Sequence, residues 1–175
     1  GNYIGGEWEA NDKFVDMRKT ADAIHAKGAK AGIWFRPLLT RGNVPEEAIL
    51  CEECGGIVLD PSHPFTLEKV YNDFTTGDAV TGQKTLTSEH HDYALVGENR
   101  KYYDKKKTTA VILKDLYKAI QHGAGSSEVI ACNAVGHLSA GIHSLYRIGN
   151  DTSGRSFEWT RRDGINSVSY THLTL

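Results

Sequence analysis

Two short apolar segments end in polar side chains of types that catalyse reactions. The first segment, VIACNA, covers residues 129–134, and the second, HSLYRI, covers residues 143–148. The polar side chains in or just after them are Cys132, Asn133, His137, Arg147, Asn150 and Asp151. Strands of a parallel sheet are buried on both faces, so their sequences are continuously apolar. Because ligands gather at the carboxyl ends of such strands, the pattern predicts the site of an α/β enzyme.

The amino-terminal part predicts a helix followed by a buried strand. Apolar residues recur there at three- and four-residue steps, behind a cap at Asn11 or Asp12. Gly28 ends this helix, as glycine commonly does. Residues 31–35, AGIWF, then predict a short buried strand. A helix joined to a buried strand is an α/β unit.

Later elements repeat this alternation on both sides of an irregular middle. Residues 56–60 predict one more short strand, whereas residues 79–107 are polar and show little periodicity. A helix is expected from Thr108 or Thr109, because an apolar face follows that includes Leu113, Leu116, Tyr117 and Ile120. Residues 156–164 predict a last helix. This order favours an α/β fold, as part of a (β/α) barrel or of a doubly wound sheet.

Composition indicates the class of protein and which kinds of binding partner it disfavours. The chain has 175 residues, enough for one domain, of which 39% are hydrophobic and 24% charged. A net charge of −2 favours neither nucleic acid nor an anionic membrane as a partner. No apolar run approaches the ~20 residues of a membrane span. Three cysteines argue against a disulfide framework. Because the chain opens on Gly1 and not on Met, the sequence does not decide between the cytoplasm and secretion. The sequence does not indicate an oligomeric state.

Six segments, in their order along the chain, resemble the α-galactosidase-like glycoside hydrolases of clan D, families 27 and 36. They are KFVDMRKTADAIHAKGAKAGIWFRPL (13–38), LDPSHP (59–64), DFTTGD (73–78), TTAVILKDLYKAI (108–120), CNAVGHLSAG (132–141) and RIGNDTSG (147–154). The resemblance implies one partial (β/α)8 TIM-barrel domain over residues 1–166, shortened near residues 70–73. Residues 167–175 do not resemble the family and are expected to lie outside that domain.

The resemblance implies retaining hydrolysis of terminal α-galactosides by two carboxylates, with no cofactor or metal. The family's nucleophile ends the fourth strand in a Lys-x-Asp motif, and the matching residue is Asp73. The acid/base lies in the segment matched by RIGNDTSG, where Asp151 is the remaining carboxylate. This chain has Asn150 for one aspartate of that motif and lacks the lysine before Asp73. The alternatives are that Asp73 is a helix-end or turn aspartate and that Asp151 is a helix N-cap.

The same resemblance implies a carbohydrate-binding set in the loops after the strands. Its members are Trp34, Arg36, Asp60, Cys132, Asn133, His137 and Arg147. Each also has a structural interpretation. Trp34 could be a core residue, Cys132 a small buried hydrophobe, and His137 a turn cap. Arg36, Asp60 and Arg147 could form structural ion pairs.

Departures from the family motifs leave enzymatic activity of this chain open, and the chain as given is expected to be inactive. A catalytically inactive carbohydrate-binding barrel is the first alternative function. The second is a zinc-stabilised module, suggested by the CEEC motif at residues 51–54 with His63, His90 and His91 nearby. Structural zinc needs four ligands in two close pairs, and the second pair lacks that spacing. A redox role for CEEC would require a strand before it and a helix after it.

Overall fold

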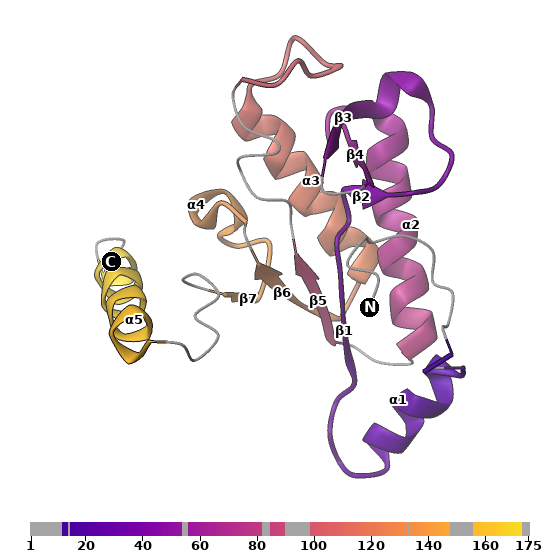
Figure 1. The fold of residues 1–175 in the computed structure, drawn as a ribbon, viewed down its shortest axis with the longest axis vertical. Helices are drawn as coiled ribbons and strands as arrows, with labels where there is room; N and C mark the ends of the chain where they lie inside the picture. Colours follow the sequence, from indigo (N-terminus) through magenta and orange to yellow (C-terminus); the bar gives the residue numbers. More distant parts are fainter. Residues whose placement is uncertain are drawn as a thin grey trace.

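The protein has an α/β fold in which helices alternate with the strands of a parallel sheet (Figure 1). The computed structural model describes residues 12–13, 15–53, 56–81, 85–89, 99–132, 134–147 and 156–172. The sheet has four strands in the order β1-β5-β6-β7, and each pair of neighbours is parallel. Its strands are β1 (Gly32–Phe35), β5 (Thr85–Glu89), β6 (Glu128–Cys132) and β7 (Leu145–Tyr146).

Helix α1 (Met17–His25) precedes β1, and Asp16 caps it, since its side chain accepts a hydrogen bond of 2.8 Å from the amide of Lys19. The cap therefore lies at Asp16, and the prediction of a cap at Asn11 or Asp12 was wrong. The predicted helix is confirmed, but only Ala21 of it is buried. The predicted strand over residues 31–35 is confirmed as β1.

A small antiparallel sheet follows β1, in the order β2-β4-β3. It consists of β2 (Leu39–Thr40), β3 (Ile49–Glu53) and β4 (Gly56–Leu59), with the 3-10 helix η1 (Glu46–Ala48) before β3. The predicted strand near residues 56–60 is thus confirmed as β4, whereas the sequence pattern did not predict β2 and β3.

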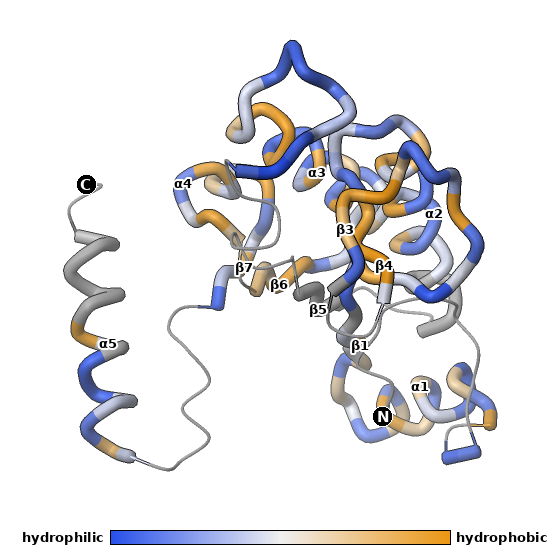
Figure 2. Tube along the Cα trace, turned by 45° about the horizontal axis from the view of Figure 1, so that its top comes forward, coloured by the Kyte–Doolittle hydropathy of each residue, from blue (hydrophilic) through white to orange (hydrophobic). Residues whose placement is uncertain are grey.

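Two long helices pack side by side behind the parallel sheet. They are α2 (Pro64–Thr81) and α3 (Thr109–Ala124). Thr108 caps α3, as predicted, by accepting a hydrogen bond from the amide of Val111. The predicted apolar face of α3 is buried, and Leu116, Tyr117 and Ile120 are at most 2% exposed. Figure 2 shows the hydrophobic parts of β4 and β6 gathered around these helices.

The helices cover one face of the parallel sheet and leave the other open. Val129 and Ala131 of β6 are buried in the core with side chains of α2 and α3, and Ile33 of β1 packs against it. On the opposite face, Trp34 of β1 is aligned, across β5, with Ile130 of β6 and Leu145 of β7. In this row Trp34 is 39% and Leu145 47% exposed.

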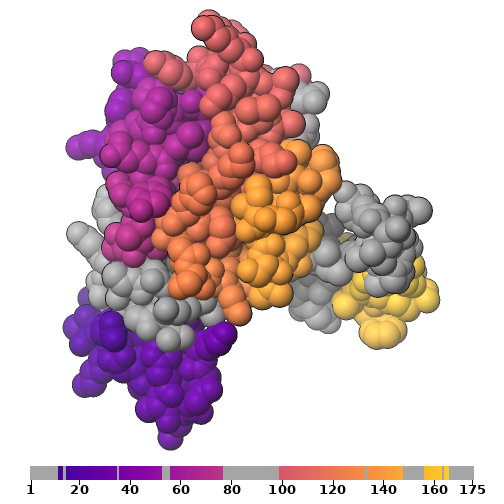
Figure 3. Space-filling view, turned by 180° about the vertical axis from the view of Figure 1, so that it is seen from behind, coloured from indigo at the N-terminus to yellow at the C-terminus, as the bar shows by residue number. Residues whose placement is uncertain are grey.

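The short helix α4 (Gly136–Ser139) follows β6, and α5 (Phe157–His172) lies to one side of the rest of the chain (Figures 1 and 3). The last helix was predicted over residues 156–164, and it begins at Phe157 and extends to His172. No helix in the described part of the chain is long and apolar enough to cross a membrane.

Candidate carbohydrate site at the carboxyl ends of the strands

The register of the parallel sheet brings three of the predicted residues to one edge. Phe35, Ser88, Ala131 and Tyr146 pair across the four strands. The next position along each strand is therefore Arg36, Glu89, Cys132 and Arg147. Arg36, Cys132 and Arg147 thus follow or end neighbouring strands at the same level. Arg36 is about a hundred residues away in the sequence from Cys132 and Arg147, and the sheet brings it beside them.

Trp34 and Arg36 contact each other on this edge. The guanidinium carbon of Arg36 lies 5.9 Å from the centre of the Trp34 ring, which is a cation–π distance. The ring is 39% exposed, so Trp34 is not a core tryptophan. An aromatic face beside a cationic group with several N–H donors can hold a sugar ring and its hydroxyls.

Asp60 has a different environment from the one expected of a sugar ligand. It is only 2% exposed, and its Oδ1 accepts hydrogen bonds of 2.7 Å from both the amide and the hydroxyl of Ser62. Its Oδ2 accepts one of 2.6 Å from the amide of Tyr103. These contacts favour a structural role, through loop hydrogen bonds and not through the ion pair that the sequence had suggested.

The connection after β6 is fixed by two tyrosines. The amide of Val135 donates to Tyr117 Oη at 2.9 Å, and Tyr146 Oη donates to the carbonyl of Ala134 at 2.7 Å. Burial, as the largest cause, raises the pKa of Tyr117 to about 12, so its hydroxyl stays protonated. The loop that carries the predicted residues is therefore held between α3 and β7.

The predicted residues of this loop have unequal exposure. Cys132 ends β6 and is buried, whereas His137 lies in α4 with its side chain exposed. The amide of Arg147 donates to the carbonyl of Ala131 at 2.8 Å, and its side chain is exposed. Asn133 lies outside the described residues, as does Asp151.

Asp73 is not at the end of a strand, where the family motif would place it. It lies in the middle of α2, where its carboxylate forms an ion pair of 2.6 Å with Lys69, one turn earlier. The side chains are 17% and 22% exposed, respectively. The segment DFTTGD, which suggested a turn, continues this helix to Thr81.

Sequence reasoning missed strand β5. It occupies the centre of the sheet between β1 and β6, within the stretch whose sequence is polar and without clear period. The resemblance implied a domain shortened near residues 70–73, but α2 runs through these residues and β5 follows it. Three residues after Glu89 the sequence has Asp92, preceded by His90 and His91, and these three lie outside the described residues.

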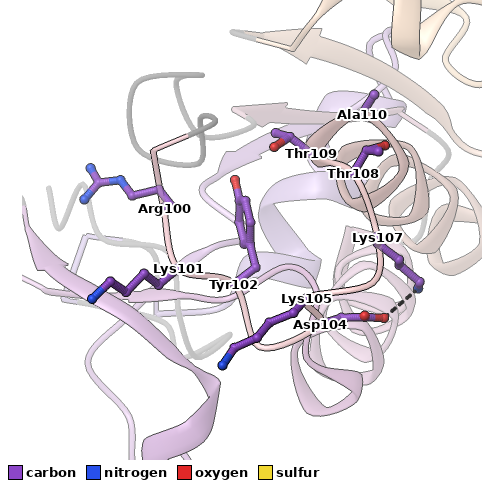
Figure 4. Close-up of a pocket in the computed structure, with 9 residues that line it drawn as sticks. All are labelled: Arg100, Lys101, Tyr102, Asp104, Lys105, Lys107, Thr108, Thr109 and Ala110. Carbon is purple, nitrogen blue, oxygen red and sulfur yellow. Dashed lines mark ion pairs between the residues drawn. The ribbon is translucent and has the colours of Figure 1, made fainter.

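A polar hollow lies in the connection between β5 and α3 (Figure 4). Its lining includes Tyr102, Thr108 and Thr109, with Arg100 and Lys101 extending to one side of Tyr102. On the other side Lys107 pairs with Asp115 at 2.8 Å and with Asp104 at 3.9 Å, and the hydrogen bond to Asp115 raises the pKa of Lys107. Among the described residues, no group of three or more His, Cys, Asp or Glu side chains could hold a metal ion.

The fold is similar to that of α-galactosidases of known structure. The chain matches TtGalA, the α-galactosidase from Thermus thermophilus, in complex with stachyose, with a TM-score of 0.63 and 19% sequence identity. It matches the complex of the same enzyme with p-nitrophenyl α-D-galactopyranoside with a TM-score of 0.63 and 20% identity. Each match covers 87% of this chain, which spans 37% and 35% of the two structures. No protein-family model matches the sequence, and no curated protein matches it.

Proposed function

We propose that this chain is part of a glycoside hydrolase that acts on terminal α-galactosides with retention of configuration. The observation that carries the proposal is the fold that the chain shares with an α-galactosidase over 87% of its length. The parallel strands β1, β5, β6 and β7 are then four strands of a (β/α)8 barrel. Their carboxyl ends, with Trp34, Arg36, Cys132 and Arg147, form part of the sugar site.

The central position of β5 supports a new choice of nucleophile. In the family that the sequence resembles, the nucleophile follows the fourth strand. The next strand of the family corresponds to the strand that ends here in Cys132 and Asn133. The fourth strand then corresponds to β5 in the sheet, and Asp92 is the first aspartate after it. We therefore place the nucleophile at Asp92 and not at Asp73, whose carboxylate pairs with Lys69 inside α2.

In this proposal Asp92 attacks the anomeric carbon, and the leaving oxygen takes a proton from the acid/base residue. A glycosyl-enzyme ester forms, and water that the same acid/base residue deprotonates then releases galactose. Asp151 follows β7 in the sequence and is the acid/base in this scheme. No metal or organic cofactor is part of the reaction that we propose.

The test uses a longer form of the protein, in which the sheet continues beyond β1 and β7. We expect it to hydrolyse p-nitrophenyl α-galactoside and to be labelled on the peptide containing Asp92 by a 2-deoxy-2-fluoro-galactosyl fluoride. Asp92→Asn should lower the rate by at least about a thousandfold, because an amide cannot form the ester intermediate. The matched control Asp73→Asn should keep the rate within about twofold and cost about 1 kcal/mol of stability. Labelling of Asp73, or normal turnover by Asp92→Asn, would contradict this assignment.

Asn150 favours a second candidate, a carbohydrate-binding relative without turnover, because an amide cannot act as a general acid. Replacement Asn150→Asp separates the two candidates in the same assay. An increase in rate by orders of magnitude would show that the acid/base belongs at position 150, whereas equal rates leave that role with Asp151.

A further inference from the structure

The loop of residues 99–108, between β5 and α3, is anchored to the turn after β4. Two consecutive amides of the loop donate to side chains of that turn. The amide of Tyr103 donates to Asp60 Oδ2 at 2.6 Å, and the amide of Asp104 donates to Ser62 Oγ at 2.9 Å. Both anchors are buried, with Asp60 2% and Ser62 6% exposed. The backbone of Tyr103 is therefore held in place by groups that water does not reach.

This anchored loop presents an aromatic ring to solvent. The side chain of Tyr103 is 55% exposed, although its ring packs edge-on against His63, with 4.4 Å between ring centres and 66° between planes. An exposed ring that is already fixed by its backbone and by a neighbouring ring loses little entropy when a ligand covers it. Exposed apolar side chains are ordinary on a protein surface, and it is this fixation that distinguishes Tyr103.

His63 adds a hydrogen-bond donor beside the ring. Its Nδ1 accepts a hydrogen bond of 3.2 Å from the amide of Phe65. The neutral imidazole that accepts at Nδ1 carries its proton on Nε2. The pair thus offers a flat aromatic surface and an N–H group, which suit the apolar face and the hydroxyls of a pyranose.

Both residues lie at the end of the molecule where the parallel strands finish. His63 directly precedes α2, and the loop of Tyr103 directly precedes α3. Both helices return the chain to the start of the next parallel strand, so their amino-terminal ends lie on the carboxyl side of the sheet. Figure 3 shows the loop of residues 99–108 at the top of the molecule, with its surface uncovered.

We propose that Tyr103 and His63 form an outer subsite for a neutral oligosaccharide. Tyr103 stacks on the apolar face of a sugar unit, and His63 donates from Nε2 to one of its hydroxyls. Asp60 and Ser62 act as positioning residues that hold the loop. The choice of a galactose-containing ligand rests on the proposed function, whereas the subsite itself rests on the anchored aromatic pair.

The test is calorimetric titration of the 175-residue chain with raffinose. Tyr103→Ala and Tyr103→Leu should each weaken binding at least about tenfold, because an aromatic anchor is lost. Tyr103→Phe, which keeps the ring, should bind within about threefold of the original. Tyr71→Ala is the matched control, since Tyr71 is a 45% exposed tyrosine in α2, and it should leave binding unchanged. His63→Phe keeps an aromatic edge without the N–H donor and should weaken binding about threefold to tenfold.

The outcomes separate this subsite from the proposed function. Loss of raffinose binding in Tyr103→Ala and Tyr103→Leu, with binding kept in Tyr103→Phe and Tyr71→Ala, supports the subsite even where a longer form fails to hydrolyse aryl galactosides. The subsite is wrong where raffinose does not bind, or where it binds Tyr103→Leu as tightly as the original chain. Circular dichroism of each variant tests whether unfolding causes the loss of raffinose binding. Tyr103→Leu retains side-chain bulk, whereas Tyr103→Ala leaves a gap.

Discussion

Asp60 matches a family motif, but its side chain has a structural role. The motif LDPSHP suggested a sugar ligand, because an aspartate at a strand end is free to bind hydroxyls. In the structure three donors occupy its carboxylate, namely the amide and hydroxyl of Ser62 and the amide of Tyr103. Hydrogen bonds to a buried carboxylate are strong, so this contact decides where the loop of residues 99–108 lies.

Replacing this carboxylate by an amide should release the loop. In Asp60→Asn the new NH2 group meets either the donors of Ser62 or the amide of Tyr103, so at least one buried N–H loses its acceptor. We expect a loss of about 2 kcal/mol in the free energy of unfolding, measured in urea, and faster trypsin cleavage after Lys101, Lys105 or Lys106. The exposed Asp22, which pairs with Arg18, provides the control Asp22→Asn, with a change below about 0.5 kcal/mol. Unchanged stability and unchanged cleavage of the loop would rule out the anchor.

His143 should make stability depend on pH. Burial lowers its pKa to about 4, from an ordinary value near 6.5. Between these values the unfolded chain binds more protons than the folded one, so the free energy of unfolding should rise as pH rises from about 4 to 6.5. The full effect of such a shift is about 3 kcal/mol, and we expect less because the ring is partly exposed. Urea titrations at several pH values measure it.

Two replacements isolate this histidine. His143→Gln should flatten the pH dependence between 4 and 6.5, because the titrating ring is gone. His122 is exposed at the carboxyl end of α3, and His122→Gln should retain the dependence. If the free energy of unfolding still depended equally steeply on pH in both variants, a group other than His143 would be responsible.

At the scale of elements, α2 and α3 lie close together at Gly123. A Cβ built there would overlap the carbonyl oxygen of Tyr71 and lie 2.9 Å from Phe74 Cβ. Thr75 Oγ1 also donates to the carbonyl of Gly123 at 3.3 Å, which links the two helices. A glycine near the end of a helix is often read as a stop signal, but here it allows the backbones to pack.

Gly123→Ala should therefore destabilise the protein by about 3 kcal/mol, because two backbones must separate to admit one methyl group. Chemical denaturation monitored by circular dichroism measures this change. Gly164 lies in α5, and nothing lies within 4 Å of the position that a Cβ would occupy there. Gly164→Ala should therefore raise helix stability by about 1 kcal/mol or leave it unchanged. Equal effects of the two replacements would mean that α2 and α3 do not meet at Gly123.

The sequence could predict the elements whose side chains follow a clear period. The face of α3 and the apolar strand β1 are examples, since burial selects side chains at fixed steps there. Strand β5 has the sequence TLTSE, in which Leu86 is the one apolar residue, so no apolar run predicted it. The alternation of helices with strands was the available signal, because a parallel strand must lie between α2 and α3.

The candidate site was predictable only where a residue directly ends a predicted strand. Cys132 and Arg36 lie at the expected edge because β6 and β1 were recognised. Asp73 lies inside α2 and not at the end of a strand, and its motif was matched without the strand that should precede it. The role of Tyr103 depends on contacts with residues about forty positions away in the sequence, and local patterns contain no information on such contacts.

At the scale of the molecule, the parallel sheet has one covered and one open face. Helices α2 and α3 bury Val129 and Ala131, whereas Trp34 and Leu145 on the other face are 39% and 47% exposed. In the described part of the chain no strand pairs with the outer edge of β1 or of β7. A closed barrel has no such edges and fills its interior with side chains of this face.

We therefore expect that the 175-residue chain itself has no measurable turnover on p-nitrophenyl α-galactoside. A sugar on the open face would contact strands on one side only, and catalysis needs the substrate to be held in the reacting geometry. The open apolar row should also bind the dye 1-anilinonaphthalene-8-sulfonate, and Leu145→Lys should reduce that fluorescence. Val15, which is 80% exposed before α1 and outside this face, provides the control Val15→Lys, with no change in fluorescence. Turnover by a monomer that melts cooperatively and does not bind the dye would show that the site is complete within this chain, with its sheet face covered.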